Sequence, residues 1–186
     1  ADAMPFADLQ GVTVIQLCGN LGAPYNYRPD QCTTEIARRL NAEGINFYAP
    51  LVLSTEALCA QLRDEEIIHQ QMAMIGECDL VLYSVGGIAP DSHLVKCGAL
   101  SAEAIKALGE QGAAGVIAGQ VIDRDGAIMD CEHNRRCISA DLDTVRQIPK
   151  RLMVVQEAEK FEALKAALRG GFVSHLVVTR SMGEQL

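Results

Sequence analysis

A chain of 186 residues, 49% of them hydrophobic, is long enough to form one domain with a substantial core. Its 16 basic and 24 acidic residues give a net charge of −8, which argues against nucleic-acid binding by the chain itself, because phosphate contacts need clustered Lys and Arg. The sequence has no long apolar run and no signal-peptide pattern, so we expect a cytoplasmic protein that does not enter a membrane.

The first half of the chain alternates between strand and helix patterns. Apolar residues at helical spacing and possible caps at Ser54 and Thr55 favour helices between short β-rich runs. The third run, DLVLYSVGG, is apolar without alternation, as expected of a strand covered on both faces of a parallel sheet. The predicted elements are strand 11–17, a helix within 33–44 that stops at Gly44, strand 45–53, a helix carrying Leu58 and Leu62 that continues through 65–76, and strand 79–87.

The second half contains a different signal, a hairpin. An Asp-Gly turn at 125–126 lies within residues 114–130, which read as two short strands rather than a crossover. The surrounding elements are predicted as helix 101–112 with Ser101 as its cap, helix 138–149 closed by Pro149, strand 151–157, helix 159–171 and strand 175–179. The fold class is therefore α/β, with a mostly parallel Rossmann-like sheet and a hairpin insertion.

Ligands of open parallel sheets gather beyond the carboxyl ends of the strands. Three loops should lie there, after the strands that end near residues 17, 85 and 155. Glycines in these loops could present backbone amides to an anion, although each could equally be an ordinary turn glycine. Taken together they favour a phosphorylated small molecule. The absence of GxGxxG after the first strand argues against a dinucleotide, and no P-loop is present.

Titratable side chains follow the third strand. His93 could act as a general base oriented by Asp91, or Asp91 could cap the following turn while His93 bonds locally. Lys96 and Lys160 could bind a phosphate or form a Schiff base, and a solvated surface lysine is the ordinary alternative for each.

Cysteine usage does not indicate a metal or a disulfide framework. The seven cysteines are an odd number without a CxxC pair, so we expect reduced thiols. Cys131, His133 and Cys137 lie close together, but no second ligand pair at zinc spacing accompanies them, and a polar loop is the favoured interpretation. No metal and no cofactor are predicted.

Four segments resemble the C-terminal effector-binding domain of the SorC/DeoR-like sugar-responsive bacterial transcription regulators. They are CDLVLYSVGGIAPDSHLVKCGALSAE (78–103), QGAAGVIAGQVIDRDG (111–126), ISADLDTVRQIPKRLMVV (138–155) and EKFEALKAALRGGFVSHLVVT (159–179); GVTVIQLCGNLG near the start matches more weakly. The resemblance implies a fold similar to ribose-5-phosphate isomerase and glucosamine-6-phosphate deaminase, here as one effector-binding domain over residues 1–186.

The resemblance also implies a function and a site. The domain is expected to bind a phosphorylated sugar or polyol without turning it over, to form homodimers or homotetramers, and to reach DNA only through an N-terminal helix-turn-helix domain absent from this chain. No residue is assigned a catalytic role. Lys160 is the leading phosphate contact, because a cation at a helix start reinforces an anion site. The expected ligand-binding residues are Gly19, Asn20, Leu21, Gly22, Gly86, Gly87, Asp91, His93 and Lys160.

Two departures from the family pattern bear on specificity. Val116 stands where family members usually carry the acidic residue of a GDI sequence, and Gln156, Glu157 and Ala158 replace a common glycine pair before the lysine helix. The sugar contacts are therefore expected to differ from those of the family. A sugar-phosphate isomerase or amino-sugar-phosphate deaminase, or an oligomerisation module with a vestigial pocket, remain the alternatives.

Overall fold

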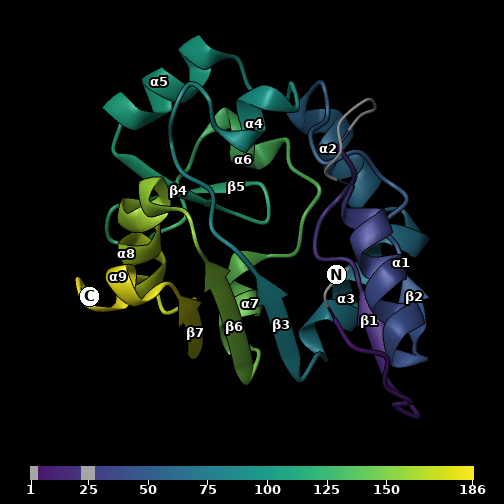
Figure 1. The fold of residues 1–186 in the computed structure, drawn as a ribbon. Helices are drawn as coiled ribbons and strands as arrows, with labels where there is room; N and C mark the ends of the chain where they lie inside the picture. Colours follow the sequence, from purple (N-terminus) through teal and green to yellow (C-terminus); the bar gives the residue numbers. More distant parts are fainter. Residues whose placement is uncertain (1–3, 22–27) are drawn as a thin grey trace.

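The computed structural model describes residues 4–21 and 28–186, and Figure 1 shows their arrangement. Strands and helices alternate along most of the chain. In order they are β1 (Thr13–Ile15), α1 (Pro29–Leu40), β2 (Glu43–Ile45), α2 (Glu56–Arg63), α3 (Glu66–Gly76), β3 (Leu80–Tyr83), α4 (His93–Lys96), α5 (Ala102–Glu110), β4 (Ala113–Ile117), β5 (Gln120–Asp123), α6 (Glu132–Arg135), α7 (Leu142–Gln147), β6 (Lys150–Val155), the 3-10 turn η1 (Ala158–Lys160), α8 (Phe161–Arg169), β7 (His175–Val178) and α9 (Arg180–Gly183).

Most strand pairs are parallel, which confirms the predicted α/β class. β3, β6 and β7 form one parallel sheet in the order β3-β6-β7, and β1 pairs in parallel with β2. β4 and β5 form a separate antiparallel hairpin. Figure 1 shows the hairpin and α4 beyond the carboxyl ends of β3 and β6.

The hairpin prediction was right about the strands but wrong about the turn that joins them. Residues Ala118 and Gly119 connect β4 to β5, with φ of 48° and 85°. Gly119 is needed there, because a Cβ would lie 2.7 Å from a Leu51 methyl carbon. The Asp125–Gly126 turn does form, but it follows β5 and leads only to a single bridge between Ile122 and Ile128.

The strand predicted at 45–53 was also too long. β2 ends at Ile45, and the following segment makes only isolated bridges, Asn20 with Pro50 and Val52 with Cys137. Pro50 has no N–H to donate to a regular ladder, which accounts for the interruption. The segment still lies deep in the fold, since Phe47, Ala49, Leu51 and Leu53 are buried.

Helix boundaries differ from the prediction where a local cap decides them. α1 begins at Pro29, a favoured first helical residue, and ends at Leu40 because Asn41 adopts a left-handed φ of 53°, so Gly44 falls within β2 instead. Thr55 and Ser101 cap α2 and α5 by accepting hydrogen bonds from Leu58 N and Ala104 N, as predicted.

Two hydrophobic clusters hold the elements together. The larger lies between the β3–β6–β7 sheet and its helices and includes Met153, Val155, Leu164 and Phe172, all fully buried. The smaller joins the hairpin to α4 and α5 through Leu94, Ile105, Val116 and Val121. All seven cysteines are free thiols, four of them buried. No described helix is long and apolar enough to cross a membrane.

Candidate functional site

The loops that follow β1, β3 and β6 were expected to meet at the carboxyl edge of the parallel strands. The structure places the loop after β3 next to both the hairpin and the segment that carries Lys160. The loop after β1 lines one hollow together with the residues that follow α4. The three loops differ in how much of their polar surface is already used by the protein.

Gly19, in the loop after β1, is buried against main chain. Its N–H donates to Ile138 O at 2.8 Å, and a Cβ at this position would lie 2.6 Å from Pro50 O and 2.8 Å from Ala49 O. The glycine is therefore required by close packing of two backbone segments. Leu21 is partly buried against the smaller hydrophobic cluster, and Gly22 lies outside the described residues.

Asn20 is tied to the same neighbouring segment. Its side-chain nitrogen donates to Phe47 O at 2.8 Å, and its side-chain oxygen accepts from the buried Gln16 at 2.9 Å. The main chain of Asn20 also accepts from Leu51 N at 2.8 Å. The amide of Asn20 thus has protein partners for both its donor and its acceptor.

The glycine pair after β3 touches two other segments. Gly86 exchanges two main-chain hydrogen bonds with Val116, of 2.8 and 2.9 Å, which fix the loop against the hairpin. A Cβ at Gly87 would lie 3.7 Å from Glu159 O, an ordinary contact distance. Gly87 therefore leaves the loop close to the segment that holds Lys160, without the tight packing seen at Gly19.

His93 and Lys160 lie near each other although they are far apart in the sequence. Burial, and after it the positive charges of Lys160 and Lys96, lower the pKa of His93 below its ordinary value. Since a neighbouring cation disfavours the protonated imidazole, His93 is held toward its neutral form. The structure thus brings together two residues predicted to bind the ligand, and Lys96 beside them.

Lys160 stands at the start of α8, as the sequence predicted. Its Nζ donates to Glu157 Oε1 at 2.9 Å, and this hydrogen bond lowers the pKa of the Glu157 carboxyl group. Only 24% of the Lys160 side chain is exposed. The ammonium group is therefore held near the loop by a carboxylate that an anionic ligand would compete with.

The residues before α4 supply a hydroxyl group. Asp91 is exposed, and Ser92, not Asp91, occupies the N-cap position of α4. Ser92 Oγ is buried and has no hydrogen-bond partner among the described residues. Because a buried hydroxyl normally has a partner, this oxygen is available to a ligand or to water.

A hollow of about 450 Å³ lies between the first loop and the residues that follow α4. Sequence reasoning did not select Arg136, which contributes to its wall and donates to Leu53 O at 2.7 Å and to Glu132 at 2.9 Å. Arg136 belongs to the polar run NRRC, where nothing distinguishes it from its neighbour before folding. The lining residues are Asn20, Pro50, Val52, Leu53, Ser54, Cys97, Gly98, Ala99 and Arg136.

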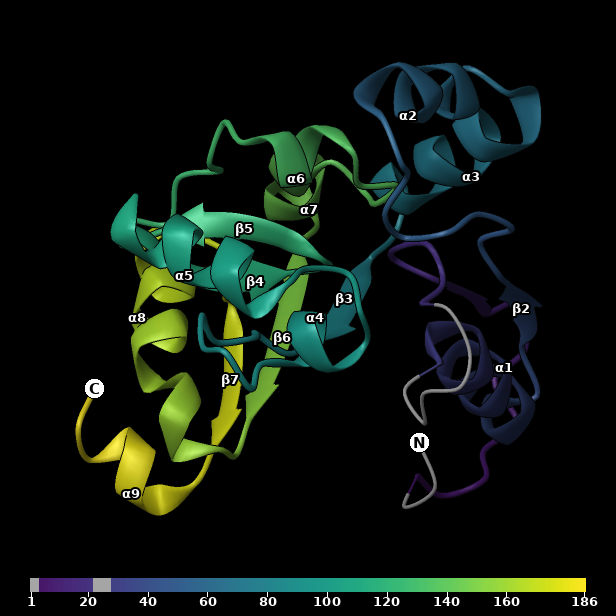
Figure 2. The ribbon, with the colours of Figure 1, turned by 90° about the horizontal axis from the view of Figure 1, so that it is seen from above.

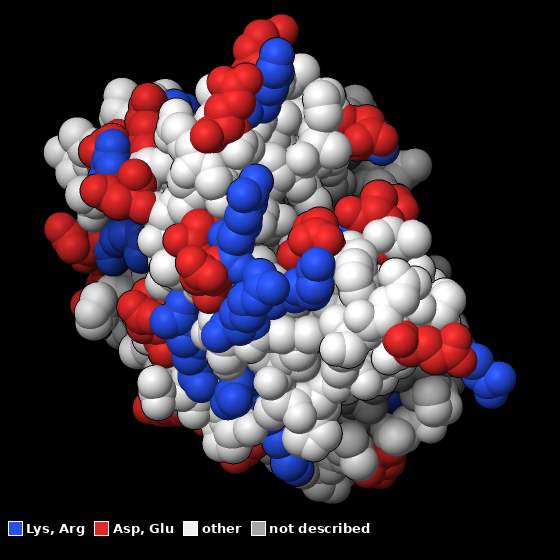
Figure 3. All heavy atoms as spheres, turned by 90° about the vertical axis from the view of Figure 1, so that its left-hand side faces the viewer, with Lys and Arg blue, Asp and Glu red and all other residues white. Residues whose placement is uncertain are grey.

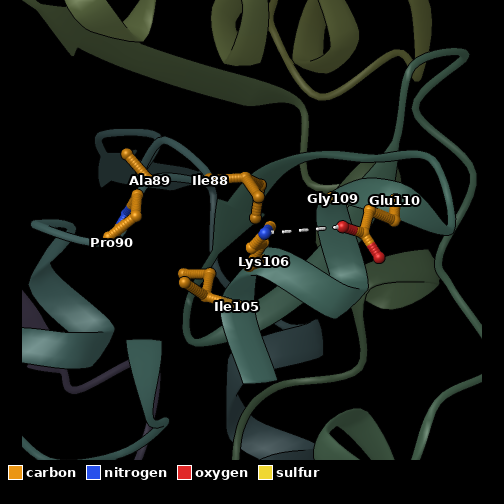
Figure 4. Close-up of a pocket in the computed structure, with 7 residues that line it drawn as sticks. All are labelled: Ile88, Ala89, Pro90, Ile105, Lys106, Gly109 and Glu110. Atoms are coloured by element: carbon orange, nitrogen blue, oxygen red, sulfur yellow. Dashed lines mark ion pairs between the residues drawn. The ribbon is translucent and has the colours of Figure 1, made fainter. Parts of the chain in front are cut away.

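A second hollow, of about 290 Å³, lies between the loop after β3 and α5. Figure 4 shows Ile88, Ala89 and Pro90 of this loop facing α5, where Lys106 Nζ and Glu110 Oε1 are 4.0 Å apart. The remaining lining residues are Ile105 and Gly109. Since most of its lining is apolar, this hollow suits a phosphorylated sugar less well than the surroundings of Lys160.

The Cys131, His133 and Cys137 group does not form a metal site in this structure. His133 Nε2 donates to Gly119 O at 2.8 Å, and burial raises the pKa of the Cys137 thiol to about 12. Residues 4–21 and 28–186 hold no group of three or more His, Cys, Asp or Glu side chains placed to bind a metal ion. His133 and Cys137 instead both bond to Gly119 O and so hold the α6 region against the hairpin turn.

Basic side chains are mixed with acidic ones on the surface that Figure 3 shows. Lys and Arg gather near the centre of this face, and Asp and Glu lie around them. Ion pairs of the described chain include Lys165 with Glu162 and Arg146 with Asp143. Such a surface lacks the uniform positive stripe that phosphate-backbone binding requires.

Comparison with known proteins gives a consistent result. The family model described as "Putative sugar-binding domain" matches residues 1–186. Among curated proteins, the Escherichia coli transcriptional regulator YjhU is 26% identical over 177 residues, covering 95% of this chain and 54% of YjhU. The transcriptional regulator LsrR of Escherichia coli is 25% identical over 176 residues, which cover 92% of this chain and 53% of LsrR.

Solved structures share the fold over nearly the whole chain. A DeoR family transcriptional regulator from Listeria monocytogenes superposes with a TM-score of 0.91 at 22% identity, covering 98% of this chain and 72% of that one. The full-length sorbitol operon regulator SorC from Klebsiella pneumoniae superposes with a TM-score of 0.90 at 19% identity, covering 99% and 61%. The chain spans about half the length of the curated relatives it matches.

Proposed function

Since the chain belongs to the sugar-binding domain family of SorC/DeoR-type transcriptional regulators, we propose that it is the effector-sensing domain of such a regulator and that its effector is a phosphorylated sugar or polyol. The family confirms the resemblance that residues 78–179 indicated. We also propose that the fold is related to that of ribose-5-phosphate isomerase and glucosamine-6-phosphate deaminase.

One observation carries the proposal: Lys160, His93 and Gly87 come together at the carboxyl edge of the parallel sheet from segments far apart in the chain. A cation at the start of α8 attracts an anion, and a neutral imidazole can exchange hydrogen bonds with sugar hydroxyls. The buried Ser92 Oγ, which has no partner within residues 4–21 and 28–186, offers one further contact. This combination suits a ligand with one anionic group and several hydroxyls.

The roles of the predicted residues follow from their surroundings. Lys160 would contact the phosphate, the main chain at Gly86 and Gly87 would permit close approach, and His93 and Asp91 would contact hydroxyls. The segment Gly19–Leu21 would form the opposite wall. Val116 is buried and its main chain is bonded to Gly86. Its side chain is a hydrocarbon, so this position offers the sugar no carboxylate.

Signal transmission would proceed through the rest of the regulator. The proposed whole protein carries a helix-turn-helix domain, binds DNA through it, works in the cytoplasm and assembles as a homodimer or homotetramer. An effector can shift such an assembly only by binding one arrangement more tightly than another. The part of the relatives beyond the region shared with this chain leaves room for a DNA-binding domain.

The relatives are named as transcriptional regulators, and we propose that this domain likewise binds its ligand without turnover. Incubation of the purified protein with pentose and hexose phosphates should give no isomerised or deaminated product. Steady conversion, detected by chromatography and abolished by His93→Gln, would replace the sensor proposal with an enzyme of the same fold.

A thermal-shift screen against sugar and polyol phosphates tests the binding proposal. A ligand that binds only the folded state at 100 times its Kd stabilises the protein by about 2.7 kcal/mol, so the unfolding midpoint rises. The unphosphorylated sugars are the matched ligand controls. If no phosphorylated compound raises the midpoint, the proposed effector class is wrong.

Calorimetry with the best compound then tests the site. We expect Lys160→Ala to weaken binding about tenfold, equivalent to about 1.4 kcal/mol, while the unfolding midpoint of the free protein stays nearly unchanged. Lys106→Ala, which removes another partly paired lysine from α5, is the control and should bind normally. Equal affinities for wild type and Lys160→Ala would exclude Lys160 as the phosphate contact.

A further inference from the structure

One face of the β3–β6–β7 sheet is apolar and exposed. Leu80, Leu82 and Val177 are 48%, 50% and 52% exposed, whereas Met153 and Val155, on the opposite face, are completely buried. Figure 2 shows α8 running along one side of this sheet. Parallel sheets are normally covered on both faces, but the described chain covers only one face of this sheet.

The strand register gathers these side chains into one patch. Leu82 lies beside Leu152 on the neighbouring strand, and Val154 lies beside Val177. Leu152 and Val154 are only partly buried and belong to neither hydrophobic cluster. The outward-facing patch is defined here as Leu80, Leu82, Leu152, Val154 and Val177. An exposed apolar surface of this kind is typical of a site that contacts another polypeptide segment, a membrane or a ligand.

The strands beside the patch also have free edges. Within the described chain, β3 pairs with β6 alone, and β1 and β2 form a parallel pair without further strands. A two-stranded pair is marginal by itself, and an open edge offers unpaired N–H and C=O groups. A segment with a strand and a helix could do both: the strand would pair with the free edge of β3, and the helix would cover the patch.

The solved structures that share this fold supply the remaining observation. They superpose on nearly all of this chain yet continue beyond the shared region, so the same framework exists within longer polypeptides. The patch also lies on the framework itself, not on an appended loop. The longer neighbours therefore favour an occupant from the same polypeptide.

We propose that a strand-and-helix segment of the full-length polypeptide, lying outside residues 1–186, pairs with the free edge of β3 and packs an apolar helix face on the patch. Lys150 and His175 are exposed at the amino ends of their strands on the same face, so an acidic side chain at that end of the helix would complement them. This inference does not depend on the sugar phosphate or on Lys160.

Thiol labelling of the polypeptide encoded by the complete gene tests the proposal. Leu82→Cys places a reporter on the patch, and Ile67→Cys, at an α3 position that is 55% exposed, is the matched control. Maleimide labelling is followed by mass spectrometry of the peptide that carries each substitution, which separates it from the seven native thiols. We expect labelling at position 82 to be about tenfold slower than at position 67, because it requires local opening of the covering segment.

Three results would overturn the proposal. Equal labelling rates at the two positions in the complete polypeptide would show an uncovered patch. Protection that disappears on dilution would identify a second copy of the chain as the occupant. A reading frame that begins at residue 1 and ends at residue 186 would leave no segment to cover the sheet. Circular dichroism and unfolding midpoints of both variants establish that the substitutions leave the fold intact.

Discussion

The loop after β1 and the loop after β3 both place glycines beyond a parallel strand, but the structure uses them differently. Gly19 and Asn20 are joined by hydrogen bonds to residues 47–51 and to Ile138, and Gly19 has main chain on its open side. Gly87 has only ordinary contacts, and the neighbouring His93 lies near Lys160. A glycine at a strand end can therefore serve backbone packing in one loop and, in the site we propose, leave room for a ligand in another.

The largest effect is expected from a substitution that disrupts the packing of the first loop. Gly19→Ala should lower the free energy of unfolding by about 3 kcal/mol, because the new methyl group would overlap the Pro50 and Ala49 carbonyl oxygens, which are main-chain atoms that cannot turn aside. Gly87→Ala is the control and should change stability by less than about 0.5 kcal/mol. Chemical denaturation measures both. If both variants lost the same unfolding free energy, the two loops would not differ in how tightly their glycines are packed.

A smaller effect should follow from removing the amide of the first loop. Asn20→Ala deletes the donor to Phe47 O and the acceptor for Gln16, and should cost about 2 kcal/mol of unfolding free energy, since buried polar groups lose their partners. Gln10→Ala removes an exposed amide that is hydrogen-bonded to Asp8 and serves as control. A loss confined to ligand affinity, with unchanged stability, would show that Asn20 belongs functionally with the second loop.

In the second loop, a charge substitution should change binding more than stability. Glu157→Gln removes the carboxylate that pairs with Lys160, and should tighten binding of a sugar phosphate about threefold, because the ammonium group no longer has a competing anion. Glu162→Gln, which removes the partner of Lys165, is the matched control. Weaker binding by Glu157→Gln would mean that the carboxylate positions Lys160 or contacts the ligand directly.

The smallest expected effect is a shift in one titration. Lys160→Met should raise the pKa of His93 toward its ordinary value, since one of the two nearby cations is lost while burial remains. NMR titration of the imidazole measures the change, and Lys165→Met should leave it unaltered. An unchanged His93 pKa in Lys160→Met would separate the two residues and weaken the proposed site.

The same lowered pKa has a consequence for stability. Because the folded state binds this proton less readily than the unfolded chain, the unfolding free energy contributed by His93 is present above the unfolded-state pKa of about 6.5 and is lost as pH falls through the folded-state pKa. His93→Gln should flatten this part of the pH profile.

Local patterns were sufficient to predict several elements. Ser101 and Thr55 cap helices in the structure because their side chains bond to amides only three residues ahead. The uninterrupted apolar run around Val81 correctly indicated a parallel strand. The expected cover on both faces was wrong for the described chain, because Leu80 and Leu82 are about half exposed. By contrast, Asp125–Gly126 suggested the hairpin turn, but Ala118–Gly119 took that role because packing against Leu51 favours a glycine there and the register of β4 with β5 fixes the connection.

The α/β class, the family and the placement of Lys160 at a helix start could be predicted from the sequence alone. These properties depend on composition and on contacts between residues close in the chain. Only the tertiary structure decided that Lys160 lies near His93, that Gly19 is occupied by packing, that Arg136 lines a hollow and that Leu82 and Val177 share an exposed patch. The physical reason is that parallel strands are joined by crossovers, so the residues that meet at a strand end or on a sheet face come from distant segments whose pairing no local pattern records.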